Sequence, residues 1–231
     1  MSLIECRDLT KRYGGSEAVS HIDLDIEPGR IVGLLGPNGS GKTTFIKMAA
    51  GLLKPSAGTL TIDGSAPGRE TKALTAYLPD REFMPGYMKV SGLLDMYGDF
   101  FHDFRRDRAE DMLSQLGIDT DKRLKNLSKG TREKVQLILV MSRDAEVYLL
   151  DEPIAGVDPA ARDYIIRTII TNYSENAAVI ISTHLIEDVE KILDEVIFIQ
   201  KGQILLHENA DDLRAARGKS VDAVFREDFR C

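Results

Sequence analysis

The sequence predicts an α/β protein built on a mostly parallel sheet. Three features favour this class: strand candidates that are apolar throughout, helical segments between them, and a change to purely helical spacing in the middle of the chain. Strands that are apolar on both faces are typical of sheets covered on both sides, and alternating strands and helices are typical of parallel connections. With 231 residues, of which 43% are hydrophobic, the chain is long enough to bury a large core and to carry an inserted subdomain.

Each strand is predicted from a short apolar run that stops at a turn signal. The segment 18–26 alternates, with Ile22 and Leu24 on one face and His21 and Asp23 on the other, which favours a strand with one buried face. A helix is expected at residues 159–171, because a proline is well tolerated in a first turn. The other strands are expected at residues 3–9, 31–35, 59–62, 74–78, 147–150, 179–182, 196–199 and 203–206, and the other core helices at residues 42–50 and 185–193.

The whole chain, residues 1–231, is interpreted as a single domain with an insert. Apolar residues recur at helical intervals within residues 85–142, which predicts a helical subdomain between two parts of the core, residues 1–84 and 143–210. Residues 211–231 hold five acidic and five basic side chains, and this balance predicts a solvated C-terminal tail.

Charge and cysteine content exclude several classes of function. The net charge of −7 disfavours binding to nucleic acid through bulk charge, because phosphates require a basic face. Cys6 and Cys231 stand far apart in the sequence, so neither a disulfide framework nor a Cys-x-x-Cys metal site is expected. The longest apolar runs, such as Leu137–Met141, are far shorter than the roughly 20 residues of a membrane span. Membrane association is therefore expected only through a partner.

A glycine-rich segment follows the strand expected at residues 31–35. The pattern G-x-x-x-x-G-K-[ST] is matched in full by Gly36-Pro37-Asn38-Gly39-Ser40-Gly41-Lys42-Thr43. Glycines let successive N–H groups point at phosphate oxygens, and the following helix directs its positive end at the same anion. Lys42 is expected to reach the β- and γ-phosphates, the hydroxyl of Thr43 to bind Mg²⁺, and Thr44 to complete the nucleotide site. A chance glycine turn is the alternative, but the position between a strand and a helix favours nucleotide binding.

Two acids close the apolar strand at residues 147–150. Ligands of parallel sheets bind beside the carboxyl ends of the strands, which is where Asp151 and Glu152 stand. Asp151 is expected to hold Mg²⁺, and Glu152 to accept a proton from an attacking water or to orient it. Exposed acids at the end of a strand are common, and it is the phosphate loop earlier in the chain that favours a catalytic interpretation.

A third segment narrows the choice of family. Its residues are Leu127, Ser128, Lys129, Gly130 and Thr131. With the two motifs above, this segment resembles the ATP-binding cassette of ABC transporters, and in particular bacterial drug- and antibiotic-resistance exporter ATPases. The family signature reads L-S-G-G-Q, so the sequence departs from it at the third and fifth positions. Considered alone, the segment is an ordinary basic, solvated helix start; Ser128 also suits the cap of a helix whose positive end faces a phosphate.

The resemblance covers almost the whole chain, from residue 3 to residue 208, and it implies a fold and partners. The implied fold is a P-loop NTPase core with an N-terminal antiparallel β-subdomain and an inserted α-helical subdomain. The implied cofactors are ATP and Mg²⁺. The implied partners are a second cassette, identical or related, whose phosphate loop faces this chain's signature, and an integral membrane permease that keeps the chain at the cytoplasmic face of the cell membrane. No nucleic acid is expected.

Further positions match the family one by one. Tyr13 resembles the aromatic residue that stacks on adenine, although a half-buried tyrosine at a strand edge would look the same. Asp158, in the segment 155–158, resembles the aspartate of the dimer loop. His184 follows a strand and resembles the catalytic switch histidine that contacts the γ-phosphate, beside Glu152 and Lys42. No role is assigned to the other histidines, His21, His102 and His207.

The residue after the strand at residues 74–78 departs from the family. The family has a glutamine that touches Mg²⁺ and senses the membrane partner, whereas this chain has Asp80. Aspartate is shorter and charged, and the resemblance implies a third metal-binding residue beside Thr43 and Asp151.

The function expected from these motifs is that of an ATP-hydrolysing subunit that powers a separate permease, with export favoured over import. The apolar residues expected at the permease contact, or alternatively in the core, are Phe83, Met84, Tyr87 and Met88. A permease-free ATP-gated clamp is the alternative, but the chain has a single set of motifs and no sustained heptad between them. An inactive binding module is disfavoured because the catalytic residue types are all present.

Overall fold

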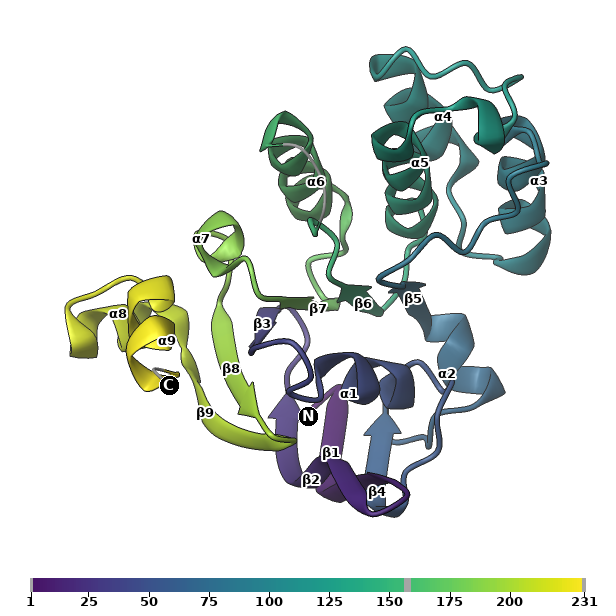
Figure 1. Cartoon of the computed structure of the whole chain (residues 1–231). Helices are drawn as coiled ribbons and strands as arrows, with labels where there is room; N and C mark the ends of the chain where they lie inside the picture. Colours follow the sequence, from purple (N-terminus) through teal and green to yellow (C-terminus); the bar gives the residue numbers. More distant parts are fainter. Residues whose placement is uncertain (1, 156–158, 230–231) are drawn as a thin grey trace.

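The protein folds around two sheets that lie one above the other (Figure 1). The computed structural model describes residues 2–155 and 159–229. The smaller sheet has the strand order β2-β1-β4, and the larger sheet has the order β5-β6-β7-β3-β8-β9. The expectation of a mixed α/β fold, with an antiparallel N-terminal sheet and a mostly parallel main sheet, is confirmed.

The N-terminal sheet is antiparallel and has one buried face. Its strands are β1 (Ile4–Tyr13), β2 (Ser16–Ile26) and β4 (Ala57–Ile62). Along β2, Ile22 and Leu24 are buried while His21 and Asp23 are exposed, as the alternation in the sequence predicts. The buried face packs against the main sheet through α1, a short helix that runs between the two sheets (Figure 1).

The main sheet is parallel except at one edge. Strands β5, β6, β7, β3 and β8 run parallel, and β9 pairs with β8 in the antiparallel sense. Every residue of β3, β6 and β7 is buried, because α1 and the N-terminal sheet cover one face and α5 and α6 cover the other. The six strands are β3 (Ile31–Leu35), β5 (Thr75–Leu78), β6 (Val147–Asp151), β7 (Ala178–Thr183), β8 (Glu195–Gln200) and β9 (Gln203–Asn209).

Helices cover the main sheet and form a separate lobe. Between β5 and β6 the chain leaves the sheet and builds the helical subdomain, which has its own apolar core around Leu93, Leu113 and Leu139 (Figure 1). The helices of the lobe are α3 (Val90–Phe100), α4 (Arg106–Gln115), the 3₁₀ turn η1 (Leu124–Asn126) and α5 (Lys129–Met141). The helices of the core are α1 (Lys42–Ala49), α2 (Arg69–Leu74), α6 (Pro159–Asn172) and α7 (Ile186–Val189). In the described part of the chain, no helix has the length and apolar character that crossing a bilayer requires.

The C-terminal segment differs from the solvated tail that its charge balance predicts. It forms α8 (Ala210–Arg217) and α9 (Val221–Asp228), and Leu213, Val221 and Val224 are buried in the main core. The rings of Phe225 and Phe229 stack with centroids 4.1 Å apart and both contact the buried Phe198 of β8. A count of charges misses this packing, because it does not show that the apolar residues of each short amphipathic helix lie on one face. The helix expected at residues 185–193 is also shorter, since α7 ends at Val189.

A buried arginine joins the helical lobe to the core. The side chain of Arg143 is 3% exposed, and its guanidinium donates to the carboxylate of Asp103 at 2.9–3.2 Å. It also donates to the backbone carbonyls of Thr75 at 2.6 Å and Ala73 at 2.5 Å, and stacks 4.0 Å from the ring of Phe101. These contacts connect the end of α5, the start of β5 and the turn after α3, so Arg143 ties the lobe to the sheet that carries the site.

Replacing Arg143 with Met should lower the free energy of unfolding by about 3–5 kcal/mol, because Asp103 and two carbonyls then lose a buried donor. Urea denaturation followed by circular dichroism measures this change. Arg105→Met is the matched control, since the ion pairs of Arg105 with Asp107 and Asp144 are exposed and should contribute less than about 1 kcal/mol. Equal losses in the two variants would contradict the role of Arg143.

Candidate active site

The loop between β3 and α1 is shaped by glycines that no larger residue can replace. Gly41 has φ +115°, and a Cβ atom there would lie 2.4 Å from the carbonyl oxygen of Ala18. A Cβ on Gly36 would lie 2.3 Å from the carbonyl oxygen of Ile199. The loop is therefore pressed against β2 and β8, which fixes the direction of its N–H groups and the start of α1.

Lys42 is the first residue of α1, directly after this loop, and is only 5% exposed. Its Nζ donates to the carbonyl oxygens of Gly36 at 2.7 Å and Pro37 at 3.3 Å, and lies 3.4 Å from Oε1 of Glu152. The ammonium group is thus held between the loop and the end of β6. A buried cation at the start of a helix attracts polyphosphate, and contact of Lys42 with the β- and γ-phosphates stays a prediction.

Asp151 ends β6 and is completely buried. Its Oδ1 accepts hydrogen bonds from the hydroxyls of Ser182, at 2.6 Å, and Thr43, at 3.1 Å. Burial raises the pKa of Asp151; these two hydrogen bonds oppose the rise, and the nearby charges of Asp80 and Glu152 add to it. The site therefore holds a carboxylate that would gain from a nearby cation.

The residues around Asp151 fit a magnesium ion. Among the described residues, Oδ2 of Asp151 is buried without a hydrogen-bond partner, and the hydroxyl of Thr43 lies beside the same carboxylate. In that part of the chain, no group of three or more His, Cys, Asp or Glu residues could hold a metal by itself. Mg²⁺ usually takes only one or two carboxylates and completes its shell with water and substrate phosphates, so this donor set suits it.

Glu152 is held in an unusual backbone conformation. Its φ is +52°, a left-handed value that costs energy for a residue other than glycine and is typical of functional sites. Its amide donates to the carbonyl and the hydroxyl of Ser182, at 3.0 and 3.1 Å. Its Oε2 lies 2.9 Å from Nδ1 of His184, and its Oε1 faces Lys42. The three residues assigned to catalysis from the sequence, Lys42, Glu152 and His184, therefore meet.

One pocket is lined by the phosphate loop and by two acidic residues, Asp80 and Glu152. Asp80, which follows β5, lines this pocket, and so does Ala18 of β2, a residue that sequence reasoning missed because nothing in its type indicates a site. Ser182 was also missed as a support for Asp151 and Glu152, because nothing in the sequence around a serine at a strand end indicates these contacts. The lining residues are Ala18, Asn38, Gly39, Ser40, Gly41, Lys42, Thr43, Thr44, Asp80 and Glu152.

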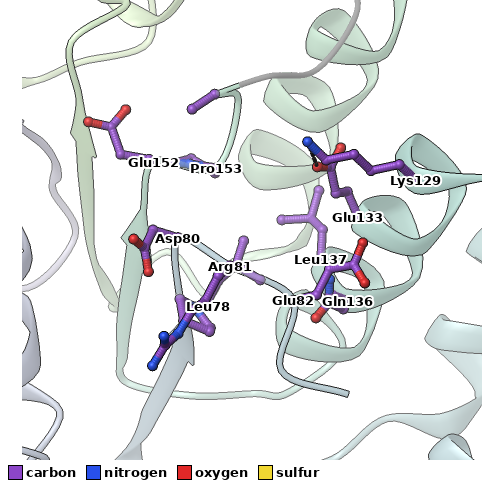
Figure 2. Close-up of a pocket in the computed structure, with 12 residues that line it drawn as sticks. Leu78, Asp80, Arg81, Glu82, Lys129, Glu133, Gln136, Leu137, Glu152 and Pro153 are labelled. Atoms are coloured by element: carbon purple, nitrogen blue, oxygen red, sulfur yellow. Dashed lines mark ion pairs between the residues drawn. The ribbon is translucent and has the colours of Figure 1, made fainter. Parts of the chain in front are cut away.

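A second groove lies beside this pocket, between the strand ends and α5. Figure 2 shows Asp80 and Glu152 on one side of it and Lys129 and Glu133 on α5 across from them. Ser128 caps α5, because its Oγ accepts a hydrogen bond from the amide of Thr131 at 3.2 Å. The signature-like segment does not line the phosphate-loop pocket of its own chain.

Tyr13 is not among the residues that line the phosphate-loop pocket. Tyr13 lies at the end of β1 with 48% of its surface exposed, and the ammonium of Lys11 is 5.4 Å from its ring centre. Its stacking on adenine stays a prediction. Asp158 lies outside the described residues.

Replacing Asp151 with Asn should stabilise the protein measured without nucleotide, because it removes a buried charge. The sign follows from the pKa: the folded state binds the Asp151 proton more tightly than the unfolded state, so the charge destabilises the fold at neutral pH. The advantage of Asn should shrink as the pH falls and vanish below about pH 4, the ordinary aspartate pKa.

The same variant should lose the stabilisation that ATP and Mg²⁺ give the wild type, about 2.7 kcal/mol at a hundredfold excess over Kd. Thermal unfolding with and without Mg-ATP measures both effects. The control is Asp111→Asn, which changes an exposed carboxylate on α4 and should alter neither. A variant that is less stable than the wild type without nucleotide would show that the Asp151 charge is fully compensated.

The phosphate loop, the buried strand-end acid and the adjacent glutamate define a P-loop nucleotide-binding protein of the ATPase type. Comparison with known proteins identifies the family: residues 19–155 match the ABC transporter family. A relative in Bacillus subtilis, the SkfA peptide export ATP-binding protein SkfE, is 30% identical over 89% of this chain and 88% of its own length. The chain therefore belongs to the ATP-binding cassettes of ABC transporters, whose members bind and hydrolyse ATP.

Other similarities point the same way. The daunorubicin resistance ATP-binding protein DrrA3 of Streptomyces coeruleorubidus is 29% identical over 94% of this chain and 72% of its own length. A solved structure of the ATP-binding subunit of an ABC transporter superposes with a TM-score of 0.88 at 24% identity, covering 98% of this chain and 99% of that one. This structural likeness shows the fold, and it agrees with the class that the site defines.

Proposed function

We propose that this chain is the ATP-hydrolysing subunit of an exporter and that it works as a dimer closed around ATP and Mg²⁺. The observation that carries the proposal is the contact of Glu152 with both Lys42 and His184 at the mouth of the phosphate loop. A carboxylate in that position can orient an attacking water and accept its proton, while Lys42 balances charge on the phosphates. Mg²⁺, held by Thr43 and Asp151, would neutralise charge on the phosphate oxygens.

Dimerisation is proposed because the signature-like segment forms the start of α5. The residues Leu127, Ser128, Lys129, Gly130 and Thr131 begin α5, and the positive end of that helix is available to a phosphate of another chain. One chain supplies the phosphate loop and the acids, whereas the second supplies Ser128 and its helix start. Loss of the γ-phosphate would remove the shared contacts and let the two chains separate, and Asp158 is proposed to lie in the contact between them.

The membrane partner is proposed to dock in an apolar groove between the core and the helical lobe. The exposed side chains of Leu52 and Phe83 border this groove, with Tyr77 and Tyr97 beside them. Tyr87, which is 68% exposed, lies on the same lobe. Exposed apolar side chains that gather beside a groove are typical of interaction sites. Export is favoured because the relatives include a peptide exporter subunit and a drug-resistance protein.

Replacing Glu152 with Gln should leave ATP binding intact and lower kcat by about 10²–10⁴-fold, because the amide cannot accept the proton of the attacking water. The variant should also elute as a dimer in gel filtration with Mg-ATP, since the sandwich forms and does not turn over. Glu175→Gln, at an exposed site, is the control and should behave as the wild type. A wild-type ATPase rate in Glu152→Gln would remove Glu152 from the mechanism.

Replacing Asp80 with Gln should make ATPase activity depend less steeply on free Mg²⁺. Asp80 adds a negative charge to a pocket that already holds Glu152 and would hold ATP. The wild type should therefore need Mg²⁺ more than Asp80→Gln does to offset this charge. The measurement is the ATPase rate against free Mg²⁺ for both proteins at fixed ATP. Overlapping curves would mean that Asp80 does not act on the metal.

A further inference from the structure

One arginine joins the loop after β5 to the first turn of α5. Nε of Arg132 donates to Oε1 of Glu82 at 2.9 Å, and Nη2 lies 2.8 Å from the same oxygen. Nη1 of Arg132 donates to the carbonyl oxygen of Leu127 at 2.8 Å. The planar guanidinium presents its donors in fixed directions, so it holds the Glu82 loop and the Leu127 carbonyl at a fixed separation.

The same residue also binds the next carbonyl along the chain. The amide of Arg132 donates to the carbonyl oxygen of Ser128 at 3.0 Å, as the first hydrogen bond of α5. Both peptide groups that flank Ser128 are therefore held by Arg132. Because the peptide unit is planar and trans, fixing the Leu127 carbonyl also fixes the direction of the Ser128 N–H. That N–H belongs to the helix start that would meet a phosphate.

Resting on the proposed function, we propose that Arg132 is a positioning residue for the signature-like segment 127–131 and that Glu82 couples this segment to the nucleotide pocket. Asp80, two residues before Glu82, lines the phosphate-loop pocket. Figure 2 shows Asp80 and Glu82 on one continuous loop beside α5, with Lys129 and Glu133 on the helix. A change at Asp80 is therefore passed through two residues of backbone to the carboxylate that Arg132 binds.

A second hydrogen bond keeps this loop on α5. The amide of Phe83 donates to Oε1 of Gln136 at 2.9 Å, and Gln136 is 4% exposed. Glu82 and Phe83 thus attach the loop to α5 at points about one helical turn apart. Phe83 also borders the apolar groove, so a partner seated there would act on the same loop.

The ion pair of Arg132 and Glu82 is partly exposed, so its effect on positioning can be measured apart from its effect on stability. The side chains of Arg132 and Glu82 are 25% and 40% exposed, and ion pairs of this kind contribute little to folding. By contrast, a displacement of about 1 Å at a reacting site can cost up to about 10²-fold in rate. Loss of the Arg132 contacts should therefore reduce catalysis and leave the fold intact.

The test replaces Arg132 with Met, which keeps the length and removes the donors. We expect kcat at saturating Mg-ATP to fall about tenfold, while the affinity of the monomer for ATP and the thermal midpoint stay at their wild-type values. Lys89→Met is the matched control, because Lys89 forms an exposed 2.9 Å ion pair with Asp121 in the same lobe and should lose no activity. Equal activity of Arg132→Met and wild type, or an equal loss in the control, would overturn the proposal.

Two further variants distinguish positioning from a general effect. Arg132→Lys keeps the charge but cannot hold Glu82 and Leu127 together, so its kcat should lie between those of wild type and Arg132→Met. Glu82→Ala should lower kcat, and adding it to Arg132→Met should cause no further loss, because the two side chains act as a unit. Additive losses would overturn the coupling to Glu82.

Hydrogen exchange gives a result that does not depend on ATPase activity. Arg132→Met should speed exchange of the amides at Ser128 and Gly130 relative to wild type and to Lys89→Met. If the wild type proves inactive and monomeric, the proposed function fails, whereas faster exchange in Arg132→Met alone still supports the positioning role. Unchanged exchange at these amides would overturn that role even in an active enzyme.

Discussion

The buried carboxylate of Asp151 is the constraint on which the rest of the site depends. It ends a strand that is buried on both faces, and it accepts hydrogen bonds from Thr43 on α1 and Ser182 on β7. Burying this charge is unfavourable, and the hydroxyls of Thr43 and Ser182 offset part of the cost, so their hydrogen bonds join the ends of β6 and β7 and the start of α1 at the carboxylate. Ser182 also holds the amide of Glu152, which places the next acid. The position of Glu152, the glutamate proposed to act on the attacking water, thus follows from the same contact.

The charges around the pocket explain why nucleotide and metal are expected together. Lys42 faces Glu152, and Asp80 and Asp151 lie close enough for their charges to affect each other. Polyphosphate would add further negative charge to a place that already holds three carboxylates. The N–H groups of the phosphate loop and the positive end of α1 offset part of this negative charge, and a divalent cation would offset more of it. Burial raises the pKa of Asp151, because it disfavours the charged carboxylate, and a cation beside that carboxylate would offset this effect.

Sequence patterns predict those parts of the site whose chemistry demands fixed residue types. The phosphate loop needs its glycines, as the 2.4 Å approach at Gly41 shows, and the strand-end acids follow a run that only a doubly covered strand would carry. Other parts of the structure depend on contacts between residues whose types form no recognisable pattern in the sequence. Ser182 and Arg143 act through partners more than thirty residues away, and the buried apolar residues of α8 and α9, such as Leu213 and Val224, stand among charges. No local pattern reports such contacts, because they exist only once the chain has folded.

The short loop after β5 brings the separate parts of the molecule together. Asp80 borders the phosphate-loop pocket, Glu82 binds Arg132 on α5, and Phe83 borders the apolar groove. Side chains of the short segment 80–83 therefore contact three neighbouring surfaces. Because the amide of Phe83 is hydrogen-bonded to the buried Gln136, the loop cannot shift at one surface without straining its attachment to α5. The coupling proposed between nucleotide, signature-like segment and partner would then run through the backbone of only four residues, 80–83.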